Sequence, residues 1–264
     1  MKCLLLFAYL LASVSSFSQI DKYNLDSLTF EQCQVLTQIF DGYETRNLRR
    51  TIKLEVEREI VDDYYEAKFH LTDYLNQNSI QSPFSTFQGD IFLIFKDDKV
   101  IYSRHEFIEI LYKVSFLDTA VSHKNSWLDK KEFQILKASY GEMYQTELNI
   151  DSMFNSRPFV YGDNCGVGGS QPYLRKLMNE KIAKNDSKSL SKWLRSHQVE
   201  KQLYGLEGIL ILKASNDIPI SETDQRIIKF LKIKKGFART CSGCSYENEK
   251  ISKIVKEIIS DYSK

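Results

Sequence analysis

Apolar residues recur every three or four positions through most of the chain after residue 158, and this spacing is typical of one face of an α-helix. The pattern predicts helices over residues 173–184, 190–196, 199–213, 221–232 and 246–262. In the last of these, one continuous apolar stripe contains Ile251, Ile254, Val255, Ile258, Ile259 and Tyr262. We expect this stripe to pack against the protein's own core.

The first half of the chain carries the same spacing over longer stretches. Glycine and proline, which interrupt helices, are scarce before residue 158. Helices are therefore predicted over residues 28–40, 52–75, from about 105 onward, and 128–140. The stretch 52–75 also alternates, at Ile52, Leu54 and Val56, and alternation favours a strand. Its length and its content of glutamate, lysine and arginine favour the helix, which is the prediction we adopt.

One segment of the first half predicts a β-hairpin instead. Two short runs rich in β-branched and aromatic residues, 91–95 and 100–102, flank the polar sequence KDDK. The predicted fold class is therefore mainly α, with a small β-hairpin near 91–102 and a helical array in the C-terminal half. We expect one helical region with the hairpin over 19–157 and a second helical region over 158–264.

Residues 1–18 predict a secretory signal peptide. Lys2 supplies a positive charge, residues 3–14 form an uncharged apolar run, and small residues precede a cleavage point after Ser18. The run is shorter than the roughly 20 residues that a membrane-spanning helix needs. We therefore expect export, to the periplasm or outside the cell, and a mature chain that begins at Gln19. No later stretch predicts a membrane span, because charged residues interrupt each long apolar run.

The charge pattern argues against nucleic acid as a partner. The chain has 36 lysines and arginines and 35 aspartates and glutamates, which gives a formal net charge of +1. Residues of both signs are interspersed, and the sequence has no basic block that could neutralise a row of phosphates. A protein or peptide partner is compatible with this composition.

Residues 190–212, LSKWLRSHQVEKQLYGLEGILIL, resemble a HEAT-type repeat. Such repeats pair a short helix that ends in two large apolar residues with a second helix rich in small and aliphatic ones. Here Trp193 and Leu194 end the first helix, and the second carries on one face Leu203, Leu206, Ile209 and Leu210. Gly205 and Gly208 inside the second helix would permit a close helix contact.

This resemblance implies helix-on-helix packing, and several such pairs would imply a binding scaffold. The exported chain, rich in lysine, asparagine and serine, also resembles uncharacterised secreted proteins of Bacteroidetes-type bacteria. That second resemblance implies no activity.

Four cysteines follow the predicted signal peptide. Cys33 lies on the apolar face of the helix predicted over 28–40, so we expect it to be a core thiol. Disulfides persist in the oxidising compartments to which exported proteins go, so Cys241-x-x-Cys244 is predicted to be a staple at a loop-to-helix joint. A bond from Cys165 to either of them is narrowly favoured over a local Cys241–Cys244 bond. The long bond would contribute about 4 kcal/mol in the chain-entropy model.

Three alternatives assign chemistry to the same cysteines. A CxxC motif at a helix N-terminus has a lowered thiolate pKa, which suits thiol–disulfide redox catalysis, but no strand of a βαβ unit is predicted before it. Cys165, Cys241 and Cys244 could bind zinc together with His197. Cys165 could also be a nucleophile that His197 activates and Asp163 orients, provided that the fold brings the three together.

No convergent catalytic set emerges from these residues. We therefore expect an exported, non-catalytic helical module that binds a protein or peptide partner and needs no cofactor. The alternative is a thiol-based enzyme, with redox chemistry at Cys241 and Cys244 or with Cys165 as the nucleophile.

Overall fold

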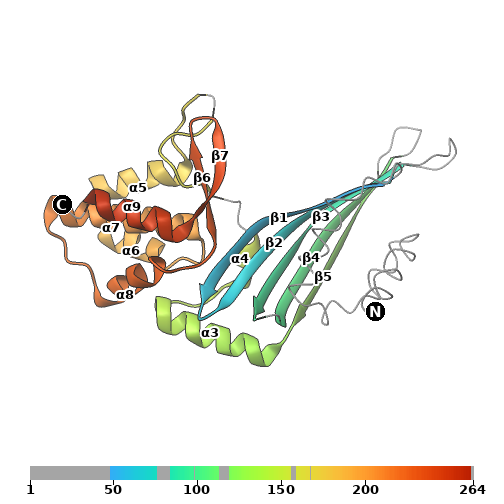
Figure 1. Ribbon diagram of the computed structural model, residues 1–264, viewed down its shortest axis with the longest axis horizontal. Helices are drawn as coiled ribbons and strands as arrows, with labels where there is room; N and C mark the ends of the chain where they lie inside the picture. Colours follow the sequence, from blue (N-terminus) through green and yellow to red (C-terminus); the bar gives the residue numbers. More distant parts are fainter. Residues whose placement is uncertain are drawn as a thin grey trace.

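The computed structural model describes residues 48–75, 84–97, 99–112, 119–155, 159–166 and 168–262. The predicted signal peptide, the helix predicted over 28–40 and Cys33 lie outside these ranges. Within them, an antiparallel sheet comes first in the chain, and helices and a short hairpin follow (Figure 1). The fold is therefore a mixture of α and β, and the predicted helical array describes only its C-terminal half.

The N-terminal half of the described chain is a five-stranded antiparallel sheet whose strands follow in sequence order. Its strands are β1 (Leu48–Val61), β2 (Tyr64–Leu75), β3 (Phe84–Lys96), β4 (Lys99–Tyr112) and β5 (Thr119–Leu128). The hairpin predicted near 91–102 is confirmed, since Ile94 of β3 lies opposite Tyr102 of β4. The helices predicted over 52–75 and from 105 onward are wrong, because these residues form β1, β2 and β4.

Alternation and a tight turn explain why residues 48–75 form strands. Ile52 lies opposite Leu71, and Leu54 lies opposite Phe69, so alternate apolar positions of β1 and β2 are paired until the register shifts between Leu54 and Val56. Asp62 and Asp63 connect the two strands, with φ angles of 47° and 60°. Two successive left-handed residues give the twist that a two-residue hairpin requires, and aspartate tolerates this conformation better than most residues. The Asp-Asp pair thus forms the tight turn that connects β1 to β2.

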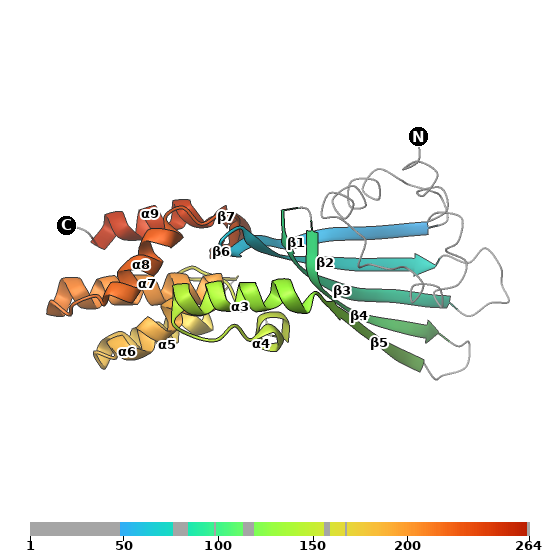
Figure 2. The ribbon, with the colours of Figure 1, turned by 90° about the horizontal axis from the view of Figure 1, so that it is seen from below.

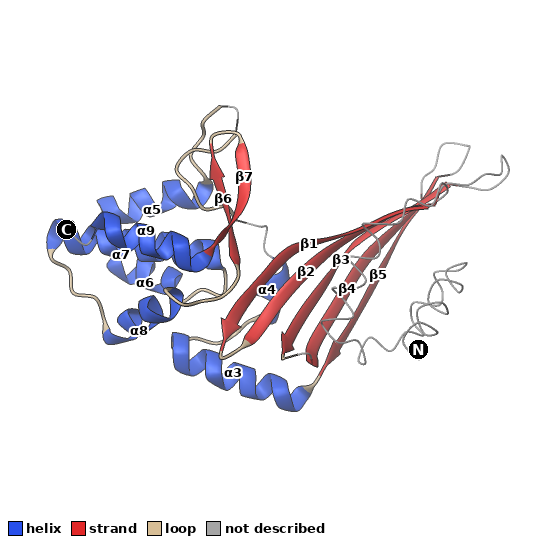
Figure 3. Ribbon diagram, in the orientation of Figure 1, coloured by secondary structure: helices blue, strands red, loops and turns tan. Residues whose placement is uncertain are grey.

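Seven helices follow the sheet in the described part of the chain. They are α3 (Lys130–Tyr144), α4 (Ile150–Asn155), α5 (Tyr173–Ala183), α6 (Ser187–Leu194), α7 (Val199–Asn216), α8 (Glu222–Leu231) and α9 (Ile251–Tyr262) (Figure 3). The helices predicted near 128–140, 173–184, 190–196, 199–213 and 221–232 are confirmed. Among these described helices, none combines the length and the apolar character that a membrane crossing demands.

The last predicted helix begins later than expected. It starts at Ile251 rather than at residue 246, because Ser245–Lys250 form β7, which pairs with β6 (Phe237–Ser242) in a second hairpin. The predicted apolar stripe of α9 does face the core, where Ile251, Ile254, Val255 and Ile258 are buried.

Helix α7 is the centre of the C-terminal half. It packs against α5, α6 and α9, and nearly all of its residues from 199 to 212 are buried. Its contact with α6 requires Gly205, because a Cβ there would collide with the backbone nitrogen of Leu194 and lie 2.8 Å from the carbonyl oxygen of Leu190. The helix pair that resembles a HEAT-type repeat is therefore present, and a glycine permits its close contact.

The sheet and the helices share one hydrophobic core. Tyr140 and Tyr144 of α3 belong to the same buried cluster as Ile60 of β1 and Leu203 of α7. Figures 1 and 2 agree that α3 lies beside the end of the sheet nearest the other helices and that the strands extend away from it. The two halves are thus joined through packed side chains and not only through the chain itself.

Buried charges lie where the sheet meets the helices. We call the junction cluster the side chains of Arg58, Glu59, Glu66, Glu200 and Lys234. The Arg58 guanidinium donates to Glu66 of β2 and, over 3.0 and 3.1 Å, to both carboxylate oxygens of Glu200 of α7. These ion pairs connect β1 to its neighbouring strand and to the central helix at once.

Lys234 is the second cation of the junction cluster, and it is only 3% exposed. Its ammonium group donates to the amide oxygen of Gln202 over 3.2 Å and to the Tyr144 hydroxyl over 3.3 Å. Burial lowers the pKa of Lys234 to about 7, and the charge of Arg58 acts in the same direction against the attraction of the three glutamates. A neutral lysine is therefore well populated at this site near neutral pH.

Candidate binding cleft

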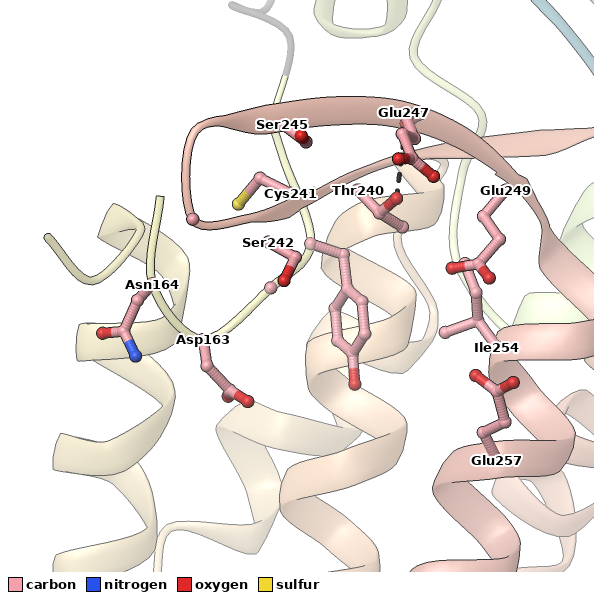
Figure 4. A pocket seen from close by; sticks show the side chains of 13 residues that line it. Asp163, Asn164, Thr240, Cys241, Ser242, Ser245, Glu247, Glu249, Ile254 and Glu257 are labelled. Carbon is pink, nitrogen blue, oxygen red and sulfur yellow. Dashed lines mark hydrogen bonds between the residues drawn. The ribbon is translucent and has the colours of Figure 1, made fainter. Parts of the chain in front are cut away.

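A polar cleft opens beside the β6–β7 hairpin (Figure 4). Its volume is about 560 Å³. Residues 161–164 form one wall, the hairpin and its turn form the second, and α9 contributes Ile254 and Glu257 to the third.

Residues 161–164 lie against β6 like a short extra strand. The Tyr161 N–H donates to the carbonyl oxygen of Arg239 over 2.9 Å, and the Cys241 N–H donates back to the carbonyl oxygen of Tyr161 over 2.9 Å. The approach is so close that a Cβ on Gly162 would lie 2.8 Å from the Cys241 sulfur. Glycine at 162 is thus what lets this wall of the cleft reach the hairpin.

A disulfide between Cys165 and Cys241 fastens the same two walls. Their Cα atoms are 5.6 Å apart, and 76 positions separate them in the sequence. This is the long-range pairing that the sequence favoured.

Cys244 is a free, exposed thiol. The predicted loop-to-helix joint is wrong, because Cys241 lies in β6, Cys244 lies in the turn before β7, and α9 begins only at Ile251. The CxxC motif therefore does not lie at the helix N-terminus that the redox hypothesis needs.

Buried polar side chains of α5 and α7 hold the wall of the cleft that residues 161–164 form. The Arg175 guanidinium of α5 donates to Glu207 of α7 over 2.6 Å and to the carbonyl oxygen of Gly162 over 3.1 Å. The Tyr161 hydroxyl donates to Glu207 over 2.8 Å, and the Tyr204 hydroxyl donates to the carbonyl oxygen of Gly162 over 2.9 Å. Every one of these groups has its charge or polar atom satisfied, so the wall rests on a fixed base.

The tyrosines of this base are held in their neutral form. Burial raises the pKa of Tyr161 far above its ordinary value, and the charge of Glu207 adds to the effect. Burial likewise raises the pKa of Tyr204 to about 12. Burial opposes the charge of Arg175, but its hydrogen bond to Glu207 and that residue's charge outweigh burial and raise the pKa. These groups therefore position the wall and do not exchange protons near neutral pH.

The charged residues that line the cleft, within the described chain, are Asp163, Glu247, Glu249 and Glu257. Asp163, with a side chain 80% exposed, lies 3.0 Å from Arg175. Lys253 pairs with Glu249 and lies 3.6 Å from Glu257. Figure 4 shows the side chains of Glu249 and Glu257 next to each other on the α9 side. Carboxylates in an open polar cleft suit a ligand that carries an ammonium or guanidinium group.

His197 is not among the groups that gather at this cleft. It lies in the turn between α6 and α7, and the groups that act on its imidazole are the Ser152 backbone, Arg58, Lys201 and Lys234. Burial lowers the pKa of His197 to about 4, so the ring is neutral at pH 7. The zinc and nucleophile hypotheses require His197 to lie beside Cys165. The fold brings Cys165 to Cys241, but it places His197 away from both. While Cys165 is bonded to Cys241, it has no free thiol that could act as a nucleophile or a zinc ligand.

The described residues contain no group of three or more histidine, cysteine, aspartate or glutamate side chains that could hold a metal ion. Sequence reasoning also missed the buried polar residues of α7, which are Glu200, Gln202 and Glu207. A signal for them exists in the sequence, because they interrupt the long apolar run of the helix between Val199 and Leu212.

Comparisons of the chain with protein-family models, with curated proteins and with solved structures found no match. The resemblance of residues 190–212 to a HEAT-type repeat therefore stays a local likeness of the α6–α7 pair.

Proposed function

We propose that this protein is an exported, non-catalytic binding module that holds a basic segment of a protein or peptide partner in the cleft beside the β6–β7 hairpin. The observation that carries this proposal is the charge of the cleft. Its described lining includes four carboxylates and no lysine, arginine or histidine. Two of these carboxylates share a single cation, Lys253, so a cationic partner would meet a net negative surface.

The rigidity of the walls supports the same proposal. The disulfide and the buried Arg175–Glu207 pair fix the segment that carries Asp163 before any ligand arrives. A preorganised site binds more tightly because little conformational entropy is lost on binding. The residues of β7 are exposed along almost its whole length, so an extended peptide can reach the hairpin.

Fluorescence anisotropy with a labelled peptide of alternating lysine and glycine would test the proposal on the mature chain. We expect saturable binding that weakens as salt is added, since salt screens exposed charges. A peptide of alternating glutamate and glycine should not bind. The double variant Glu247→Gln/Glu257→Gln should lose about tenfold in affinity, since each exposed pair contributes up to ~1 kcal/mol.

The matched control is Glu142→Gln/Glu180→Gln, which removes two exposed carboxylates from α3 and α5, away from the cleft. It should bind the lysine peptide as the parent chain does. Equal losses in both double variants would show attraction to overall charge and would reject the cleft as the site.

Export is tested separately. Protein recovered from cells that express the full chain should have an N-terminus at Gln19, and mass spectrometry of the N-terminal peptide measures this. Full-length chain that begins at Met1 in the membrane fraction would contradict export in the proposed form.

A further inference from the structure

The three described cysteines converge on one turn. Cys165 pairs directly with Gly243, since the Gly166 N–H donates to the Gly243 carbonyl oxygen over 2.8 Å and the Gly243 N–H donates to the Asn164 carbonyl oxygen over 3.1 Å. Cys244 is the next residue after Gly243. An exposed thiol therefore lies one position along the chain from the strand partner of Cys165 and three positions from Cys241.

We infer that Cys165, Cys241 and Cys244 form a thiol–disulfide exchange site, in which Cys244 displaces Cys165 from Cys241. The Cys244 thiol loses its proton to water and its thiolate attacks the Cys241 sulfur. A Cys241–Cys244 bond forms, the Cys165–Cys241 bond breaks, and Cys165 leaves as a thiolate that takes a proton from water. One disulfide and one thiol are present before and after, so the step needs neither oxidant nor reductant.

Local structure favours this direction of attack. Cys241 and Cys244 lie on one hairpin, so their proximity does not depend on residues 161–170. Gly243 between them has a φ of 57°, and glycine passes between backbone conformations that other residues cannot adopt. Cys165 lies in a turn with Gly166 and Gly169, both of which also have positive φ. Once released, Cys165 is held beside Gly243 by backbone hydrogen bonds and no longer by a covalent bond.

The exchange would also loosen one wall of the cleft. The Cys165–Cys241 bond ties the wall that carries Asp163 to β6. Its loss leaves that wall held by backbone hydrogen bonds to β6 and by the side chains of Arg175 and Tyr204, with no covalent bond to the hairpin. This consequence for binding rests on the proposed function, whereas the exchange itself does not. Disulfide mapping reports on the exchange and peptide binding reports on the cleft, so failure of one is distinguishable from failure of the other.

Peptide mapping of the oxidised mature chain tests the exchange. The protein is kept at about pH 8 with a small amount of reduced glutathione, blocked with N-ethylmaleimide and digested with trypsin. Cys241 and Cys244 remain on one tryptic peptide, residues 240–250. We expect the maleimide label to move from Cys244 to Cys165 in a measurable fraction of molecules, with an internal disulfide in the 240–250 peptide. The Cys244→Ser variant should keep only the Cys165–Cys241 bond.

The Cys165→Ser variant gives a second, independent readout. It should form the Cys241–Cys244 bond in oxidised glutathione, with tryptophan fluorescence showing that it is folded. The inference is overturned if this variant leaves both thiols open to maleimide or forms only intermolecular bonds. It is equally overturned if the parent chain yields Cys165–Cys244, or keeps its label on Cys244 under all conditions.

Discussion

At the scale of single residues, Lys234 shows how burial couples one charge to stability. Its pKa falls from 10.5 to about 7 on folding, with burial as the main cause. Between these two values the unfolded chain holds the proton and the folded chain does not. The free energy of unfolding therefore rises with pH across this window, by up to ~1.4 kcal/mol per pH unit. Below about pH 7 both states are protonated and this contribution stays at its lowest value.

The Lys234→Met variant should lose this pH dependence. We expect the parent chain to gain about 2 to 3 kcal/mol between about pH 7 and 9, and the variant to gain much less. Urea unfolding at several pH values measures the difference, with Cys33→Ser and Cys244→Ser in both chains so that no free thiol can exchange with the disulfide. The control Lys232→Met removes an exposed neighbouring lysine and should keep the rise. Parallel curves for the parent chain and Lys234→Met would contradict the argument.

At the scale of elements, the contact between α6 and α7 depends on the absence of a side chain at Gly205. Alanine there should destabilise the protein by ~2 kcal/mol or more, because its Cβ meets the backbone of α6, which cannot move away cheaply. Gly141→Ala in α3 is the matched control, since its Cβ would meet only the Thr146 carbonyl oxygen at 3.9 Å. That change should stabilise by up to ~1 kcal/mol through helix propensity. Thermal unfolding of both variants gives the comparison, and equal shifts would disprove the close contact.

Helix α9 makes a second prediction at this scale. Ile254 is 3% exposed, so Ile254→Asp places an unpaired carboxylate in the core and should cost several kcal/mol, on the order of 3 to 5. Ser260→Asp adds the same side chain to the exposed face of the same helix and should cost less than ~1 kcal/mol. Urea unfolding measures both. An unchanged midpoint for Ile254→Asp would mean that α9 is not docked on the core in solution.

At the scale of the whole molecule, the shared core and the junction cluster predict that the sheet and the helices unfold together. The chain has two tryptophans, Trp127 in β5 and Trp193 in α6, so each half carries its own reporter. The single-tryptophan variants Trp127→Phe and Trp193→Phe should show transitions that coincide with each other and with circular dichroism. Two separated transitions would mean that the halves are independent domains.

Arg58 provides the complementary test of that coupling. Arg58→Met leaves Glu66 and Glu200 buried without their cation, which should cost about 3 to 5 kcal/mol. Because these acids belong to β2 and α7, the midpoints of both single-tryptophan chains should fall together. A shift confined to the Trp127 reporter would show that the cluster stabilises the sheet alone.

The sequence by itself determined the helices of the C-terminal half. In α5, α6 and α8 the 3.6-residue spacing comes from burying one face of the helix, which is a local property that neighbours in the chain encode. Helix α7 is buried on nearly all sides, and its long apolar run predicts it instead. The same holds for the hairpin near 91–102, whose two apolar runs flank a polar turn. Predicted export, the glycines around Cys165 and the chain-entropy gain of a long loop were enough to propose Cys165 as a disulfide partner.

Only the tertiary structure decided between helix and strand over residues 48–75. Both spacings are present there, and the choice depends on β3, which pairs with β2 from outside the local window. The choice of Cys241 over Cys244 has the same origin, because Cys241 reaches Cys165 only once residues 161–164 have paired with β6. The junction cluster and the acidic cleft likewise collect side chains from segments far apart in the chain. The sequence shows which residues are charged. Only the packing decides which of these charges lie close together and how deeply each one is buried.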